Sequence, residues 1–220
     1  MKPIIALNLK AYQESLGKPG VRLCEIAEEV SHYTGVRIIA APQAIDLRNA
    51  AGVCRDVFAQ HIYPNPMGAF TGSITADAIK QAGARGSLVN HSEHRIPEKV
   101  IAATIAKLKE TGLESMLCTK DTEESVKLAK YKPTFLAVEP PELIGSGISV
   151  STAKPEIVSG TVEAVAQVNG TPVLCGAGVS TPEDVKKAIE LGAAGVLLAS
   201  AYVKASDPKR LLLDMAQAVK

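Results

Sequence analysis

Eight short apolar runs recur along the chain, and a charged stretch with helical spacing follows each of them. The runs lie at residues 4–7, 36–41, 57–59, 87–89, 115–118, 135–138, 172–175 and 196–198. They are almost continuously apolar instead of alternating with polar residues, which is typical of parallel strands buried on both faces. Strands of this kind separated by helices predict an α/β fold built on a parallel sheet.

The segments between the runs carry recognisable helix signals. Residues 21–30 place their apolar side chains on one helical face, and residues 97–108 begin with a proline that we expect in the first helical turn. Thr181 is a predicted N-cap followed by Pro182 and two acidic residues, and Gly192 is the predicted end of that helix. Each apolar run is therefore predicted to be a strand that leads into a helix.

Eight strand–helix alternations are the number that closes a (β/α)₈ barrel, although an open doubly wound sheet would share the same pattern. Such barrels typically contain about 250 residues. The 220 residues of this chain therefore predict shortened helices, and residues 46–51 have the length of a helix reduced to a stub. We find no linker or low-complexity segment, so we expect one domain spanning residues 1–220.

Composition argues against several classes of partner. The net charge is +1, which gives no electrostatic reason to expect nucleic acid or an anionic membrane. No apolar run approaches the ~20 residues that span a bilayer, and the N-terminus becomes polar too soon for a signal peptide. None of the four cysteines forms a C-x-x-C pair, so we expect reduced, mostly buried thiols in a cytoplasmic protein.

Polar residues follow the first and fourth runs, where a barrel places its active site. If the first strand continues to Lys10, alternation directs Asn8 and Lys10 to the barrel mouth, where Lys10 could bind an anion or simply reach water. After the fourth run, His91 could act as an acid, a base or an electrophile, or belong to a surface turn. A metal set of His91, Glu93 and His94 matches no standard zinc motif, so we expect no metal.

The sixth, seventh and eighth runs add a carboxylate and small residues at the same face. Glu139 ends the sixth run as a candidate general base, and residues 140–147 could form a lid or an ordinary surface loop. Residues 176–180 and 199–200 are small enough for backbone N–H groups to approach a phosphate. Neither glycine cluster completes a G-x-G-x-x-G pattern, which disfavours a dinucleotide cofactor.

Four motifs occur in one order along nearly the whole chain: Asn8-x-Lys10, Gly68 to Gly72, His91 to Arg95, and Glu139 with the segment that follows it. In this order the chain resembles the triosephosphate isomerase family, whose fold is the TIM barrel. The shortened helices and the lid sequence at 140–144 are most similar to its archaeal branch. The chain departs from many members at the lid, which lacks tryptophan, at His94 instead of Arg, and at 199–200 instead of Gly-Gly.

The resemblance implies a cofactor-free isomerase of glycolysis and gluconeogenesis. It would interconvert glyceraldehyde 3-phosphate and dihydroxyacetone phosphate by proton transfer through an enediolate. Glu139 would be the base, neutral His91 a hydrogen-bond donor to the enediolate, and Lys10 its counter-charge, paired with Glu93. The family pattern assigns substrate and phosphate contacts to Asn8, Lys10, Ile144, Gly145, Gly178, Ala199 and Ser200, with Lys10 supplying positive charge to the phosphate as well as to the enediolate.

The resemblance also implies self-association, as a homodimer or a homotetramer. The loop at 63–74 is long, and its Met67 and Phe70 suggest burial against another surface. In the family this loop enters the neighbouring subunit, so Thr71 would support Asn8 and Lys10 from another chain. Two alternatives remain: another phosphate-binding barrel isomerase or synthase, and a non-catalytic sugar-phosphate sensor.

Overall fold

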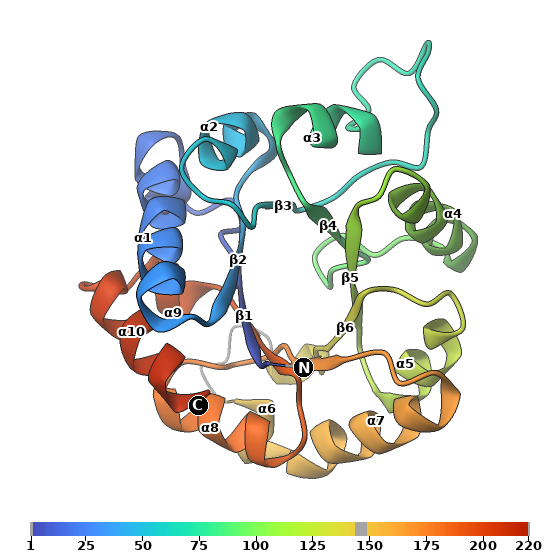
Figure 1. Cartoon of the computed structure of the whole chain (residues 1–220). Helices are drawn as coiled ribbons and strands as arrows, with labels where there is room; N and C mark the ends of the chain where they lie inside the picture. Colours follow the sequence, from blue (N-terminus) through green and yellow to red (C-terminus); the bar gives the residue numbers. More distant parts are fainter. Residues whose placement is uncertain (1, 144–148, 220) are drawn as a thin grey trace.

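The computed structural model describes residues 2–143 and 149–219. Within them, eight parallel strands form a ring that the helices surround (Figure 1). The strands are β1 (Ile4–Asn8), β2 (Arg37–Ala41), β3 (Phe58–Ala59), β4 (Gly86–Val89), β5 (Glu114–Thr119), β6 (Phe135–Val138), β7 (Val173–Cys175) and β8 (Gly195–Leu198). Their order, β2-β1-β8-β7-β6-β5-β4-β3, confirms the predicted (β/α)₈ barrel.

The barrel closes between β2 and β3. A single parallel bridge joins Ala40 to Val57, and the Ala40 N–H donates to the Asp56 carbonyl at 2.9 Å. Arg37, which begins β2, binds Asp56 at 2.7 Å between its Nη2 and Oδ1, and also pairs with Glu114 at the start of β5. These carboxylates raise the pKa of Arg37 above its ordinary value. Ionic contacts thus support the seam where the strand pairing is shortest.

The helices follow the strands in the predicted alternation. They are α1 (Lys18–Thr34), α2 (Leu47–Ala51), α3 (Ala76–Ala82), α4 (Glu98–Glu110), α5 (Thr122–Ala129), α6 (Val150–Ala153), α7 (Pro155–Val168), α8 (Pro182–Glu190), α9 (Ser200–Val203) and α10 (Pro208–Ala218), with 3₁₀ turns η1 (Gln13–Ser15), η2 (Ala44–Asp46) and η3 (Pro141–Leu143). The expected stub is α2, and five residues suffice there because only Leu47 and Ala50 are buried.

Local signals explain where two of the helices begin. The Thr181 hydroxyl accepts the Asp184 N–H, and the Asp184 carboxylate accepts the Thr181 N–H, which forms a capping box at the start of α8. Gly192 then follows the helix end with φ 88°, as expected. The placement of Pro97 in the first turn of α4 was wrong. Its ψ of 147° is extended, so Pro97 is the N-cap residue and the helix begins at Glu98.

Alternate residues of each strand enter two separate cores. In β1, Ile4 and Ala6 point into the barrel, where they pack with side chains such as Phe135, whereas Ile5 and Leu7 pack outward against the helices. Burial on both faces explains why the strand sequences are continuously apolar. All four cysteines are free and buried, as predicted, and burial raises the pKa of the Cys54 and Cys175 thiols to about 12.

Candidate active site

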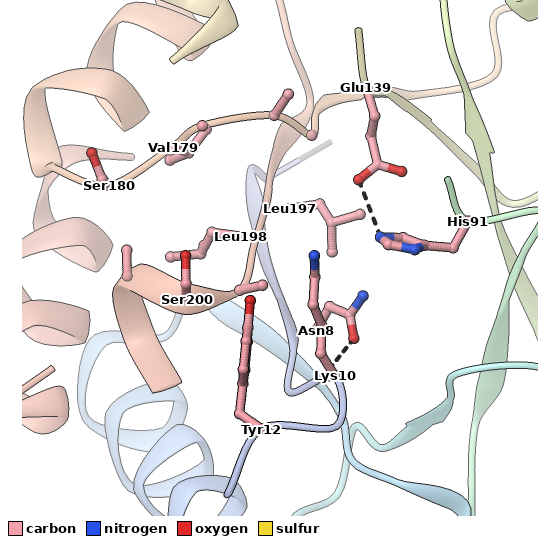
Figure 2. A pocket seen from close by; sticks show the side chains of 15 residues that line it. Asn8, Lys10, Tyr12, His91, Glu139, Val179, Ser180, Leu197, Leu198 and Ser200 are labelled. Carbon is pink, nitrogen blue, oxygen red and sulfur yellow. Dashed lines mark hydrogen bonds and ion pairs between the residues drawn. The ribbon is translucent and has the colours of Figure 1, made fainter. Parts of the chain in front are cut away.

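One pocket opens at the carboxyl ends of the strands (Figure 2). Its lining residues come from the carboxyl ends of β1 and β8 and from the segments after β1, β4, β6, β7 and β8: Asn8, Lys10, Tyr12, His91, Glu139, Gly176, Ala177, Gly178, Val179, Ser180, Leu197, Leu198, Ala199, Ser200 and Ala201. Most of the side chains selected from the sequence therefore meet in one place. Ile144 and Gly145 lie outside the described residues, and Thr71 is exposed on the loop between β3 and α3.

Lys10 reaches this pocket from a turn and not from the strand. The condition that β1 continues to Lys10 is not met, because the strand ends at Asn8 and Lys10 has a left-handed φ of 48°. The Asn8 side-chain oxygen accepts the Lys10 N–H at 3.0 Å, which favours the turn over further pairing. The Gln60 side chain donates to the Lys10 carbonyl at 3.0 Å, so both backbone groups of Lys10 are held by side chains.

The Lys10 ammonium is held at the mouth by an ion pair. Its Nζ lies 2.7 Å from Oε1 of Glu93, and the Lys10 side chain is 13% exposed. Because Glu93 is more than half exposed, solvent screens its charge. The ion pair therefore holds Lys10 in place. Because Glu93 is screened by solvent, the positive charge of Lys10 still acts on a ligand in the pocket.

His91 is held in one tautomer by its own loop. Its Nδ1 accepts the Glu93 backbone N–H at 3.2 Å, so the proton of the neutral ring is on Nε2. The preceding Asn90 has φ 61°, and its side chain donates to the Cys118 carbonyl and accepts the Ile96 N–H, both at 3.0 Å. This anchoring aims the Nε2–H of His91 into the pocket (Figure 2).

Glu139 faces His91 from the end of β6. Its side chain is 3% exposed, and Oε1 lies 3.5 Å from His91 Nε2. Its other oxygen, Oε2, is buried and has no hydrogen-bond partner among the described residues. Burial and the nearby Glu139 carboxylate raise the pKa of the Cys118 thiol, so Cys118 stays protonated beside it. Glu139 is thus a carboxylate with one oxygen, Oε1, facing His91 and a second oxygen, Oε2, that accepts no hydrogen bond from the described residues.

Glycine at position 176 allows β7 to pass close to this carboxylate. A β-carbon there would lie only 2.6 Å from Cγ of Glu139. From the sequence, Gly176 is predicted only as part of a phosphate loop, so its contact with Glu139 was not predicted. Tyr12 was not predicted either, since an aromatic residue in a loop carries no signal of its own for a binding site.

The far end of the pocket is built from backbone. Gly178 has φ 70°, and Ala199 and Ser200 stand where β8 gives way to α9. Ser180 also lines the pocket, but its N–H and hydroxyl both donate to the Asp184 carboxylate, at 2.9 and 3.2 Å. Peptide groups and small side chains therefore form this end, which suits an anion.

A sequence model of triosephosphate isomerase matches residues 3–219 of the chain. The chain belongs to the triosephosphate isomerase family. Similar proteins include the triosephosphate isomerases of Methanothermus fervidus (52% identical, covering 97% of both chains), Methanosarcina acetivorans (46% identical, 99% of both) and Methanocaldococcus jannaschii (48% identical, 96% of this chain and 98% of the relative). These organisms are archaea, which agrees with the resemblance of this sequence to the archaeal branch of the family. None of the helices in the described part of the chain is long and apolar enough to cross a membrane.

Proposed function

We propose that this chain interconverts glyceraldehyde 3-phosphate and dihydroxyacetone phosphate without a cofactor, as a cytoplasmic single-domain enzyme of glycolysis and gluconeogenesis. The observation that carries this reading is the buried, unpartnered Oε2 of Glu139 in the pocket where the Nε2–H of His91 also points. A non-catalytic sugar-phosphate sensor would have no need for such a base. Family membership favours the isomerase over another phosphate-binding barrel enzyme.

Glu139 moves the proton in this mechanism. Its carboxylate removes a proton from the carbon next to the substrate carbonyl and returns it to the neighbouring carbon. The Nε2–H of neutral His91 donates to the oxygens of the enediolate, and the Lys10 ammonium offsets their negative charge. Glu93 supports both groups, because its carboxylate pairs with Lys10 and its N–H fixes the tautomer of His91.

Backbone amides hold the phosphate in this proposal. Gly178, Ala199 and Ser200 offer N–H groups from the loops after β7 and β8, and Gly145 adds one from the lid. Asn8 orients the substrate at the end of β1. Ile144 covers the bound substrate and excludes water, which would otherwise let the enediolate lose its phosphate.

We also propose that the active form is a homodimer or a homotetramer. The loop between β3 and α3 extends away from the barrel (Figure 1), and on it Met67 is 73% and Phe70 42% exposed. Its base is fixed, since the Tyr63 N–H donates to the Ile74 carbonyl at 2.8 Å. A pinned loop with an apolar tip suits insertion into a second copy, where Thr71 would support Asn8 and Lys10.

The role of Glu139 is tested by Glu139→Asp in a coupled assay with glyceraldehyde 3-phosphate. The shorter side chain withdraws the carboxylate by roughly 1 Å, and a displacement of that size costs on the order of 10²-fold in rate. We expect kcat to fall by about that factor with KM nearly unchanged. Glu110→Asp, at an exposed position at the end of α4, is the matched control. An inactive wild-type protein, or a Glu139→Asp variant with near-normal kcat, would contradict the proposal.

A further inference from the structure

The phosphate end of the pocket is poor in side-chain donors. The lining side chains with N–H or O–H groups are those of Asn8, Lys10, Tyr12, His91, Ser180 and Ser200. His91 lies beside Glu139 (Figure 2), the Lys10 ammonium is paired with Glu93, and the Ser180 hydroxyl is occupied by Asp184. Residues 176–178 carry no donor side chain at all. Among the described residues, Tyr12 and Ser200 are therefore the uncharged side-chain donors left available at the phosphate end, in addition to the Lys10 ammonium.

The backbone of Tyr12 is fixed by the turn that follows it. Its carbonyl accepts both the N–H and the hydroxyl of Ser15, at 3.1 and 3.0 Å. Ser15 itself is fully buried, so this turn cannot shift without disturbing the interior. The phenol of Tyr12 consequently projects from a stable base two residues after Lys10.

The ring of Tyr12 is held by a residue from near the end of the chain. The Nζ of Lys204 lies 4.4 Å from the ring centroid, within the range of a cation–π contact. Lys204 ends α9, and its N–H donates to the carbonyl of Ser200 at 2.9 Å. The helix that begins at the phosphate end thus carries the cation that covers the tyrosine ring.

The Tyr12 hydroxyl is free to bind a ligand. It has no hydrogen-bond partner among the described residues, and Figure 2 shows it directed toward the part of the pocket where Ser200 lies. A neutral O–H donor beside a dianion forms a charge-assisted hydrogen bond, which is stronger than a neutral one.

We propose that Tyr12 is a substrate-binding residue whose phenolic hydroxyl donates to the phosphate of the triose phosphate, and that Lys204 is the positioning residue that holds its ring. The inference rests on the proposed function and extends it to residues outside the family motifs described above. The phosphate does not change charge during the isomerisation, so this contact is equally strong in the ground state and the transition state. It therefore lowers KM and leaves kcat unaffected.

Tyr12→Phe tests the hydroxyl, because it keeps the ring and its contact with Lys204. We expect KM for glyceraldehyde 3-phosphate and the inhibition constant of inorganic phosphate each to rise about tenfold, with kcat within about twofold of wild type. Slow turnover of glyceraldehyde, which has no phosphate, should be unchanged. Tyr33→Phe removes the hydroxyl of a tyrosine that is 80% exposed on α1 and serves as the control. Unchanged KM and phosphate inhibition in Tyr12→Phe would overturn the proposal.

Lys204→Met separates positioning from general electrostatics. If Lys204 acts through the tyrosine, the substitution raises KM about threefold in the wild type and has no further effect in Tyr12→Phe. Equal effects in both backgrounds would overturn the positioning role. Failure of the proposed function can be told apart from failure of the Tyr12 proposal, because it would appear as an inactive wild-type protein. Phosphate binding to wild type and Tyr12→Phe, measured by calorimetry, would still test the hydroxyl in that case.

Discussion

Gly176→Ala places one methyl group against the proposed base without touching the reacting atoms. The new β-carbon would lie 2.6 Å from Cγ of Glu139 and 3.1 Å from the carbonyl oxygen of Val138. Non-bonded carbon atoms pack at about 3.5–4.0 Å, so the Glu139 side chain must retreat by about 1 Å. Gly176 does not have a left-handed φ, so alanine adds no backbone strain there.

The expected consequence is kinetic. A ~1 Å misplacement of a catalytic group costs on the order of 10²-fold in rate. That factor corresponds to about 2.7 kcal/mol in the activation barrier. We expect Gly176→Ala to lower kcat by about this factor while KM changes little, because the phosphate contacts remain.

The assay compares steady-state kinetics with unfolding in urea. Gly160→Ala is the matched control, since a β-carbon at this position in α7 meets no atom within 4 Å. It should leave kcat unchanged and add roughly 0.5–1 kcal/mol of stability, as alanine does in a helix interior. A folded Gly176→Ala protein with kcat within a few-fold of wild type would refute the reasoning that the position of Glu139 limits the rate.

Two further predictions concern assembly and acid stability. Sedimentation velocity at low protein concentration, run beside the activity assay, should show an oligomer, and a fully active monomer would refute both the assembly and the role of Thr71. Burial and the adjacent His94 lower the pKa of His61 to about 4. An unfolded histidine titrates near 6.5, so protons bind the unfolded state first and the free energy of unfolding falls as pH drops from about 6.5 to 4. His61→Asn should flatten this dependence in urea titrations at pH 7 and 4.5, and an unaltered slope would contradict the assignment.

Sequence pattern predicted the strands well because burial on both faces leaves a strong signal. Each apolar run coincides with an observed strand to within one or two residues, and the cap at Thr181 follows from local chemistry alone. The turn at Lys10 was missed because strand periodicity extends the strand by default. Two contacts of Lys10 become visible only in the folded structure. The Asn8 side-chain oxygen accepts its N–H in place of strand pairing, and Gln60 donates to its carbonyl.

The site residues that escaped prediction depend on contacts between distant parts of the chain. Tyr12 lines the pocket together with Ser200 and Ala201 of α9, near the other end of the sequence, and Lys204 lies over its ring. Gly176 matters because β6 and β7 pair in a register that places it beside Glu139. Neither relation has a local sequence signature. By contrast, Lys10, His91 and Glu139 were selected as candidates because polar residues at the ends of buried strands often have no packing role, and the order of the motifs supported them.

Unsatisfied polar atoms alone would not have located the site. Among the described residues, His61 Nε2, Ser92 Oγ and Thr104 Oγ1 are also buried without a partner. Only Glu139 combines an unpartnered oxygen with a place in the lining of the pocket. An unsatisfied buried group costs about 1–3 kcal/mol, and a carboxylate at this position keeps that cost unless a bound molecule supplies the missing donor. The 3.5 Å between Glu139 and His91 is longer than a normal hydrogen bond, so these two groups do not satisfy each other. Neither group is committed to the other, so both are free to contact a molecule bound in the pocket that they line, as a proton transfer with a polarised carbonyl requires.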